Sequence, residues 1–399
     1  MQGLRTSTDF SVTVLSACLL FATWMSAPAL ADEPQVIRVG PERDVKTPSA
    51  AAEIATDGAI VEIDAGVYLK DAAVWRQNNL TLRGVGGRAH LKSEGTTVEG
   101  KAIWVIKGHN TRVENIEFSG ARVKDRNGAG IRQQGNGLTV VGCSFHDNEN
   151  GILSGNQPES VILIDRSEFA SNGYGDGRTH NMYIGRAKSF TLQNSYVHHA
   201  KAGHNVKSRA AINRILYNRI MDEGTGTSSY ALDFPEGGQA VVVGNSIQQG
   251  PDTENSTVVN FSRESNEVPG QLQFVHNTIV NDRHTGIFIK NRSSKSALVV
   301  NNIFAGKGKA VVGAAEAKGN LFVRASAPEG STGNRTASKA GFRDRAAFDY
   351  RLVAGSAAID HGLRAGERFA GFQYVHLAGS KPRPRVEAPD IGAFEFEGR

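Results

Sequence analysis

Asn218-Arg219-Ile220, Asn245-Ser246-Ile247 and Asn277-Thr278-Ile279 are three copies of the short pattern that decides the fold of this chain. The same pattern recurs at Asn194, Asn302 and Asn320, and in degenerate form at Cys143 and Ser167, with 18 to 32 residues between consecutive copies. Short runs rich in Val and Ile precede most copies. Self-similarity of this period is typical of a solenoid, and β-branched strands separated by Gly and Asn indicate a β-solenoid.

The asparagine column has a structural explanation. In stacked coils, equivalent residues lie about 4.8 Å apart. An asparagine at a turn tolerates left-handed backbone geometry, and its amide can bond to the asparagine of the next coil. We therefore predict an internal asparagine ladder. Cys143 aligns with this column, and we expect it to be a small buried residue.

The two ends of the repeat also have recognisable patterns. Thr47-Pro48 followed by an alanine-rich stretch predicts a short helix that closes the first coil, with Thr47 as N-cap. The period is lost after Phe322. We therefore predict an all-β chain: a parallel β-helix over residues 32–323, then a loop and a C-terminal capping segment over residues 324–399.

Two further segments carry a family resemblance. Residues 57–68, DGAIVEIDAGVY, resemble the opening of the pectate-lyase-like superfamily of right-handed parallel β-helices, and residues 389–396, PDIGAFEF, resemble the closing strand of many secreted members. The likeness extends over nearly the whole mature chain. It implies a right-handed β-helix, but no single reaction, because the superfamily includes lyases, hydrolases, epimerases and non-catalytic binding proteins.

Residues 1–31 have the features of a secretory signal peptide. Arg5 is followed by an apolar run from Phe10 to Trp24 and by small residues at Ala29-Leu30-Ala31. We expect export to the periplasm or the extracellular space, with no membrane segment after cleavage; lipoprotein processing at Cys18 is the alternative. The net charge of +5 and the pI of about 9.1 favour polyanionic partners. For an exported monomer these are acidic polysaccharides rather than nucleic acid.

A second strand can be aligned in each coil, and it predicts a row of polar side chains. Side chains alternate along a strand, which places Tyr183, Lys207 and Asp233 on the outer face of successive rungs, about 5 Å apart. By the same alternation Asn181 and Asn205, two residues earlier, are expected to point outward. The intervening apolar residues are expected to point inward: Met182, Ile184, Val206, Leu232, Val259, Ile287 and Ile289.

The segment Gly203–Arg209, GHNVKSR, resembles part of a known active site. Some alginate- and chondroitin-degrading β-helix lyases carry an Asn-Lys-Ser motif on an equivalent strand, and Val206-Lys207-Ser208 is similar to it, with Asn205 one position early. The resemblance implies that Lys207 abstracts the proton next to a uronate carboxylate. Those lyases have an arginine on the next coil, where this chain has Asp233. Arg209 or Arg178 is then left to stabilise the developing charge.

β-Elimination needs a base, a group that neutralises the uronate carboxylate and a proton donor for the leaving oxygen. A lysine acts as base only when burial or positive neighbours lower its pKa, and Asp233 on the next rung opposes this. Tyr183 and nearby histidines are the candidate donors. The predicted catalytic residues are Lys207, Tyr183, Arg209, His204, His180 and Asp233. The predicted substrate-binding residues are Asn181, Asn205, His199 and Arg178.

Other functions remain open from the sequence. A calcium ion held by Asp222, Glu223 and Asp233 is one alternative for the carboxylate-rich loop. A hydrolase needs two carboxylates, which Asp233 with Asp222, Glu223 or Glu236 would supply. An epimerase or a non-catalytic glycan-binding protein would use the same exposed face.

Overall fold

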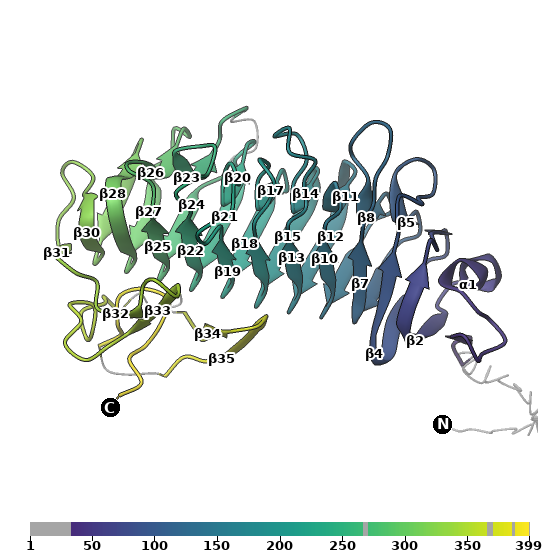
Figure 1. Ribbon diagram of the computed structural model, residues 1–399. Helices are drawn as coiled ribbons and strands as arrows, with labels where there is room; N and C mark the ends of the chain where they lie inside the picture. Colours follow the sequence, from purple (N-terminus) through teal and green to yellow (C-terminus); the bar gives the residue numbers. More distant parts are fainter. Residues whose placement is uncertain (1–32, 266–269, 365–369, 385–387, 399) are drawn as a thin grey trace, which may run out of the picture. The chain divides into compact units, whose positions relative to one another are not determined.

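Parallel strands stacked in coils make up most of the chain. The computed structural model describes residues 33–265, 270–364, 370–384 and 388–398, so the leader expected at residues 1–31 lies outside it. In this part of the chain, 31 strands, β1 to β31, hydrogen-bond in parallel (Figure 1). Each strand pairs with its equivalent in the next coil, and this pairing defines three sheets.

Sheet 1 carries the row of polar residues that the sequence predicts. Its strands are β3 (Ala73–Trp75), β5 (Ala102–Ile106), β8 (Ala129–Gln133), β11 (Asn150–Ser154), β14 (Met182–Ile184), β17 (Val206–Ser208), β20 (Leu232–Phe234), β23 (Thr257–Phe261), β26 (Ile287–Asn291) and the end of β28 (Ile303–Val312).

Sheet 2 follows sheet 1 in each coil. Its strands are β1 (Val36–Val39), β2 (Ile60–Leu69), β4 (Thr81–Lys92), β6 (Thr111–Glu114), β9 (Leu138–Val141), β12 (Gln157–Asp165), β15 (Ala187–Gln193), β18 (Ile212–Leu216), β21 (Gln239–Val243), β24 (Leu272–Val275), β27 (Ala297–Val300) and β29 (Ala315–Lys318).

Sheet 3 completes the coil. It starts with the second halves of β2 and β4 and continues through β7 (Ile116–Ser119), β10 (Ser144–His146), β13 (Glu168–Ala170), β16 (Tyr196–His198), β19 (Arg219–Met221), β22 (Ser246–Gln249), β25 (Thr278–Asn281), the first half of β28, β30 (Leu321–Ser326) and β31 (Arg335–Ala337).

Aromatic rings stack inside the coils. Phe118, Phe145 and Phe169 occupy equivalent positions of successive coils, and their ring centres lie 4.9 and 4.7 Å apart. All three side chains are fully buried. Burying one such ring contributes about 2–3 kcal/mol, and a ring pair adds about 1 kcal/mol. Since the described cysteine is a free thiol, Cys143, the stability of the coils rests on this burial and on backbone pairing.

The predicted asparagine ladder is present and continues beyond the predicted positions. From Asn218 each side-chain amide donates to the amide oxygen of the next coil, across 2.9 to 3.1 Å. The members are Asn218, Asn245, Asn277, Asn302, Asn320 and Asn334. The same oxygens accept backbone N–H groups, so the buried turn has its polar groups satisfied.

Asn194 does not belong to the ladder. Tyr196 pairs with Arg219, so Ser195 is the residue in register with Asn218, and its N–H donates to the Asn218 side-chain oxygen across 2.9 Å. Asn194 lies one residue earlier, at a φ of 53°, where its amide donates to Asp165. The prediction for this coil is wrong by one residue because Asn194 and Ser195 both suit the turn.

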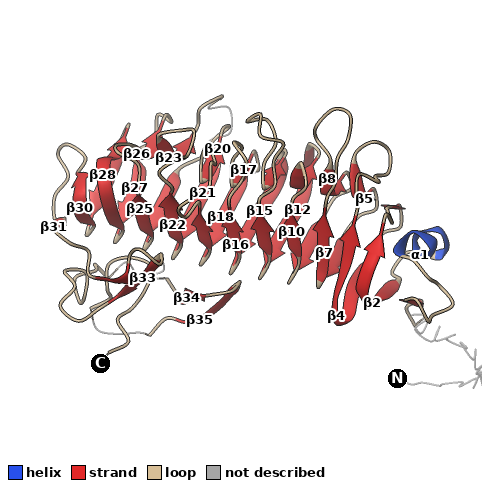
Figure 2. Ribbon diagram, viewed as in Figure 1, coloured by secondary structure: helices blue, strands red, loops and turns tan. Residues whose placement is uncertain are grey.

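The described chain has one helix, α1 (Pro48–Ile54), at the N-terminal end of the coils (Figure 2). The Thr47 hydroxyl accepts the N–H of Ala50, as expected for the N-cap. Ala51 and Ala52 are buried against the first coils. In the described residues, no helix is long and apolar enough to cross a membrane.

The C-terminal segment differs from the prediction in two ways. The stretch expected to be a loop contains β31, so the last rung ends at Ala337 rather than near residue 323. The rest forms two antiparallel pairs: β32 (Phe342–Asp344) with β33 (Asp349–Leu352), and β34 (Phe372–Val375) with β35 (Gly379–Pro382). Its buried apolar residues pack against those on the outside of sheet 3, from Met221 to Val323. Figure 1 shows β32 to β35 beside the coils.

Candidate functional site

Tyr183, Lys207 and Asp233 occupy successive rungs of sheet 1, in the register that the sequence predicts. Tyr183 of β14 pairs with Lys207 of β17, and Lys207 pairs with Asp233 of β20. The row continues to Asn260 and Lys290. Of the residues expected to point inward, Met182, Ile184, Val206, Leu232, Val259 and Ile289 are buried, and Ile287 is half-buried. Alternation along the strands therefore places chemically distinct groups side by side.

On the N-terminal side of Tyr183 the row continues through Leu153, Arg132 and Val105, so one cation lies between two apolar residues. Leu153 and Val105 lie on the same outer face and pack with Ala102 and Ala129 into a small cluster that Tyr183 contacts. The Tyr183 ring thus lies between Leu153 of this cluster and Lys207. A surface that combines apolar and charged groups suits a sugar ring that carries a carboxylate.

Lys207 is a half-buried amine close to other cations. Its Nζ lies 4.9 Å from the centre of the Tyr183 ring, and no hydrogen bond or ion pair of this side chain is found among the described residues. Burial lowers the pKa of Lys207; Asp233 opposes this shift, and Arg209 and Arg263 reinforce it. A lysine with a lowered pKa is a better proton acceptor near neutral pH.

Arg209 connects Tyr183 to a rim of charged residues that follow the strands of sheet 1: Arg186, Arg209, Glu236, Arg263 and Glu264. Its Nε donates to the phenolic oxygen of Tyr183 across 2.8 Å, and its terminal nitrogens bond to Glu236 at 2.8 Å and Glu264 at 2.5 Å. Glu236 also accepts a two-pronged contact from Arg186, at 2.9 and 3.1 Å. Because the Tyr183 oxygen already accepts a hydrogen bond, its own proton is free to be donated to another group.

Asp233 lies on the row but is fully buried. One carboxylate oxygen accepts the Asn260 amide across 2.6 Å, and the other lies 3.4 Å from Nε2 of His204. Burial raises the pKa of Asp233, although the Asn260 hydrogen bond and the positive charge of Lys207 oppose the shift. No ion pair joins Lys207 and Asp233 among the described residues, so the objection to Lys207 as a base is weaker than the sequence suggests.

His180 and His204 are buried beneath the row, not exposed as proton donors. Their rings stack with centres 4.5 Å apart, and the His180 Nδ1 accepts the backbone N–H of His204 across 2.9 Å. Burial lowers the pKa of His180 to about 3 and that of His204 well below its ordinary value. Both rings are therefore neutral at neutral pH. Their contacts suit a role in positioning the side chains of the row. The His180 ring contacts the Tyr183 ring edge-on, and the His204 ring contacts Asp233.

Asn181 and Asn205 do not point outward as predicted. Both are fully buried, and the Asn181 amide donates to the Asn205 oxygen across 2.8 Å. They continue a second internal ladder that begins at Asn148 and Asn172. The prediction is wrong because β14 and β17 begin one residue later, so the alternation does not extend to these turn positions. The preceding coil also has this position facing inward. There Gly151 is equivalent to Asn181, and a Cβ added to Gly151 would lie 2.8 Å from the buried ring of Phe169.

His199 and Arg178 have contacts outside the row. The His199 ring bonds to His198 across 2.8 Å and to the Thr225 hydroxyl across 3.3 Å. Arg178 is exposed in the loop before β14, where its backbone N–H donates to Asp176. Neither side chain bonds to Tyr183, Lys207 or Asp233 in the described structure, and the substrate-binding role expected for them stays a prediction.

The carboxylates suggested as a calcium site do not converge. Asp222 is buried, and its oxygens accept the Ser228 hydroxyl across 2.6 Å and the Asn205 amide across 3.5 Å, at the end of the second ladder. Burial raises the pKa of Asp222 to about 6. Glu223 instead bonds to Tyr196 and Arg219. Since Asp233 has its own partners, these three residues do not fit calcium, whose sites need converging oxygens.

Arg263 and Glu264 belong to the rim although the sequence analysis did not select them. Arg263 follows β23 and bonds to Glu264 across 2.8 Å. Its positive charge acts to lower the pKa values of Lys207, Asp233 and His204. A recurring pattern in the sequence could have predicted this rim. Charged residues recur one to three positions after the strands of sheet 1: Arg186, Arg209, Glu236, Arg263 and Glu264.

A cavity of about 430 Å³ lies elsewhere, between sheet 3 and the C-terminal segment. Arg219, Tyr350, Tyr374 and His376 contribute to its lining, and the row on sheet 1 does not.

Comparison with known proteins bears on the fold. No family model and no curated protein matches this sequence. Among solved structures the chain is similar to the pectate lyase Pel9A, with 14% identity and a TM-score of 0.59 over 91% of this chain and 96% of that one. A PL6 family alginate lyase, AlyGC, matches with 14% identity and a TM-score of 0.35 over 89% and 60% of the two chains. The stacked parallel strands and the likeness to Pel9A identify the chain as a right-handed parallel β-helix with the pectate-lyase-like fold.

Proposed function

We propose that this protein is an enzyme that cleaves an acidic, uronic-acid-containing polysaccharide by β-elimination, with Lys207 as the base. The observation that carries the proposal is the setting of Lys207. Lys207 is half-buried, its pKa is lowered by burial, and it lies one rung from Tyr183 on the outer face of sheet 1. The fold shared with a pectate lyase supports a reaction of this class.

In the proposed reaction, the free amine of Lys207 takes the proton from C5 of the uronate. The electron pair left on C5 forms the C4–C5 double bond, and the C4–O4 bond breaks. Tyr183 donates its phenolic proton to the departing O4. The Nε–H of Arg209, 2.8 Å from the phenolic oxygen, stabilises the negative charge that remains on Tyr183.

The uronate carboxylate must be neutralised for C5 to lose its proton. Arg209 is largely committed, because it bonds to Glu236 and Glu264 and its side chain is only 16% exposed. Arg263 is 38% exposed and pairs with Glu264 alone in the described structure. We assign the substrate carboxylate to Arg263, with the carboxylate taking the place of Glu264.

One observation favours a hydrolase as the second candidate. Burial raises the pKa of Asp233, while Arg186 and Arg209 hold the pKa of Glu236 below its ordinary value in spite of its burial. Carboxyl groups with opposite shifts are typical of an acid and base pair. However, Asp233 is fully buried and Glu236 is bonded to two arginines, so neither faces an open sugar site.

We also propose that the protein acts outside the cytoplasm. The leader expected at residues 1–31 would deliver a monomeric enzyme to the periplasm or the outside of the cell, where acidic polysaccharides are found. Mass spectrometry of the exported protein tests this point, and an N-terminus at Asp32 is the expected result.

A substrate screen tests the activity. The protein is incubated with polygalacturonate, alginate, chondroitin sulfate and hyaluronate, and with a neutral glucan as control. A lyase produces the ultraviolet absorbance of the C4–C5 double bond, whereas a hydrolase produces reducing ends without it and a binding protein produces neither. Lys207→Met, which keeps the aliphatic chain, should abolish the absorbance. Lys188→Met is the matched control, because Lys188 is an exposed lysine on sheet 2. Full activity of Lys207→Met would show that the base is a different residue.

A further inference from the structure

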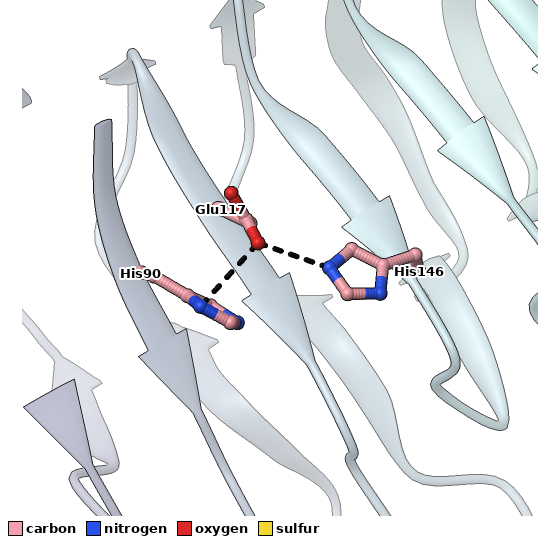
Figure 3. Close-up of side chains that lie close together, drawn as sticks. All are labelled: His90, Glu117 and His146. Atoms are coloured by element: carbon pink, nitrogen blue, oxygen red, sulfur yellow. Dashed lines mark hydrogen bonds and ion pairs between the residues drawn. The ribbon is translucent and has the colours of Figure 1, made fainter. Parts of the chain in front are cut away.

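Two histidines and a glutamate lie together on the outside of sheet 3, away from the row on sheet 1. His90 belongs to β4, Glu117 to β7 and His146 to β10, three neighbouring strands (Figure 3). His90 is directly opposite Glu117 in the register. His146 is opposite Ser119, two residues along the same strand as Glu117 and on the same face. Each side chain thus comes from a different coil and is held on a paired strand.

The three side chains point one potential ligand atom each toward a common point. Nδ1 of His90 lies 3.3 Å from Oε1 of Glu117, and Nε2 of His146 lies 3.0 Å from the same oxygen. Figure 3 shows the carboxylate between the two rings. All three ligand atoms lie within 4.8 Å of one another, and no other group of three histidine, cysteine or acidic residues meets this limit in the described chain.

The far nitrogens of both rings have their own partners. Nε2 of His90 bonds to the Ser119 hydroxyl across 2.7 Å, and Nδ1 of His146 bonds to the Asp147 carboxylate across 3.0 Å. In the metal-bound form, each far nitrogen would donate its proton to its oxygen partner, and the near nitrogen would offer its lone pair to the ion. An outer oxygen that fixes the ring in this way is a regular feature of histidine ligands to metals.

The electrostatic setting also suits a cation. The three side chains are 19%, 25% and 30% exposed, so an ion between them would be partly shielded but would retain access to water ligands. Burial lowers the pKa of His90, although the carboxylate of Glu117 opposes the shift. Burial acts in the same direction on His146, but the carboxylates of Asp147 and Glu117 outweigh it and raise its pKa. Protons and a metal ion would compete for this ring.

We propose that His90, Glu117 and His146 form a binding site for one divalent transition-metal ion, with Zn²⁺ as the expected occupant. Two imidazoles and one carboxylate are a ligand set that Zn²⁺ and Co²⁺ accept, whereas Ca²⁺ and Mg²⁺ require oxygen ligands. The bound ion would replace the hydrogen bond between Oε1 of Glu117 and Nε2 of His146 and the contact between the same oxygen and Nδ1 of His90. It would cross-link three successive coils near the N-terminal end. The proposal is independent of Lys207 and of any activity.

Metal titration of the untagged, chelator-treated protein tests the site. Co²⁺ should bind one ion per chain with visible absorption bands of an imidazole-bound ion, Zn²⁺ should displace it, and Ca²⁺ should not. Binding of Zn²⁺ should also raise the melting temperature. His90→Gln, Glu117→Gln and His146→Gln should each weaken binding more than about 10-fold, and Asp147→Asn about 10-fold through its effect on His146. Circular dichroism checks that each variant is folded.

Two variants serve as controls. His284→Gln removes an exposed histidine elsewhere and should leave Co²⁺ binding unchanged. His199→Gln removes one ring of the His198–His199 pair, a competing histidine-rich position. Binding that survives both His90→Gln and His146→Gln, or that is lost in His199→Gln, would overturn the assignment. So would the absence of any bound Co²⁺ at neutral pH.

Discussion

The amine nitrogen of Lys207 lies 4.9 Å from the centre of the Tyr183 ring, one rung away on the same face of sheet 1. The residues are 24 positions apart in sequence and come from different coils. A protonated amine is attracted to the ring face, and the neutral amine gains no such attraction. The proposed base and the proposed acid are therefore in direct contact. A variant that keeps the Tyr183 ring but lacks its hydroxyl can distinguish proton donation from stacking against the sugar.

Tyr183→Phe should reduce kcat by about 100-fold to 10,000-fold and leave KM nearly unchanged. The substitution keeps the ring beside Lys207 and the apolar cluster, but it removes the hydroxyl that donates the proton. Steady-state kinetics on the substrate found by the screen measures both constants. Tyr174→Phe, at an exposed tyrosine in the loop before β14, is the control. A raised KM with normal kcat would mean that Tyr183 only stacks against the sugar.

The pH profile should report the free amine of Lys207. The base is active when deprotonated, so kcat/KM should rise with pH and level off above the pKa of Lys207, which burial places below the ordinary 10.5. Asp233 raises this pKa and Arg263 lowers it. Asp233→Asn should therefore move the rising limb to lower pH, and Arg263→Gln should move it to higher pH. Shifts in the same direction, or no shift in either variant, would contradict the assignment.

Asn277→Ala should destabilise the coils by roughly 3 kcal/mol. The side chain is fully buried and bridges Asn245 and Asn302. Its removal deprives the buried backbone N–H of Asn245 of its acceptor and the buried carbonyl of Val242 of a donor. Asn334→Ala, at the less buried end of the ladder, should cost about 1 kcal/mol. Because solenoids do not always unfold in one step, hydrogen exchange at each coil should accompany the thermal melt. Equal losses in the two variants would contradict a buried ladder.

Cys143 should not react with thiol reagents in the folded protein. Its side chain is fully buried, and burial raises the pKa of the thiol to about 12, so the thiolate needed for reaction is scarce at neutral pH. In denaturant, the chain that begins at Asp32 should yield one reactive thiol. Rapid labelling without denaturant would mean that the coils around Cys143 open readily.

Repetition in the sequence is what made the fold predictable. The asparagines from Asn218 to Asn320 mark one turn position in successive coils, and alternation along short strands placed Tyr183, Lys207 and Asp233 in one row. Both inferences use only spacing and backbone geometry. They fail where a strand begins one residue away from the position assumed, as at Asn194, Asn181 and Asn205.

Much of the site depends on tertiary contacts that spacing does not encode. His180 and His204 lie in polar loops, which suggests exposure, but their rings stack against each other beneath the row. Arg209 was selected as a free cation, but Glu236 and Glu264 bind it from 27 and 55 residues away. The partners follow different strands of sheet 1, so only the folded coils bring these charges together.

The asparagine ladder constrains how proteins of this kind can change length. Each amide contacts its equivalents in the coils above and below and the backbone of neighbouring turns, so a whole coil inserted between Asn245 and Asn277 would offer its neighbours the same set of contacts. The loops elsewhere in the coil can grow without disturbing this junction, as the unequal intervals between ladder residues already illustrate. A register shift of one residue at the junction would instead place His276 or Thr278 in the row of amides in place of Asn277. Gain or loss of complete turns is thus the tolerated form of variation, and it would lengthen or shorten the outer surface by one rung at a time.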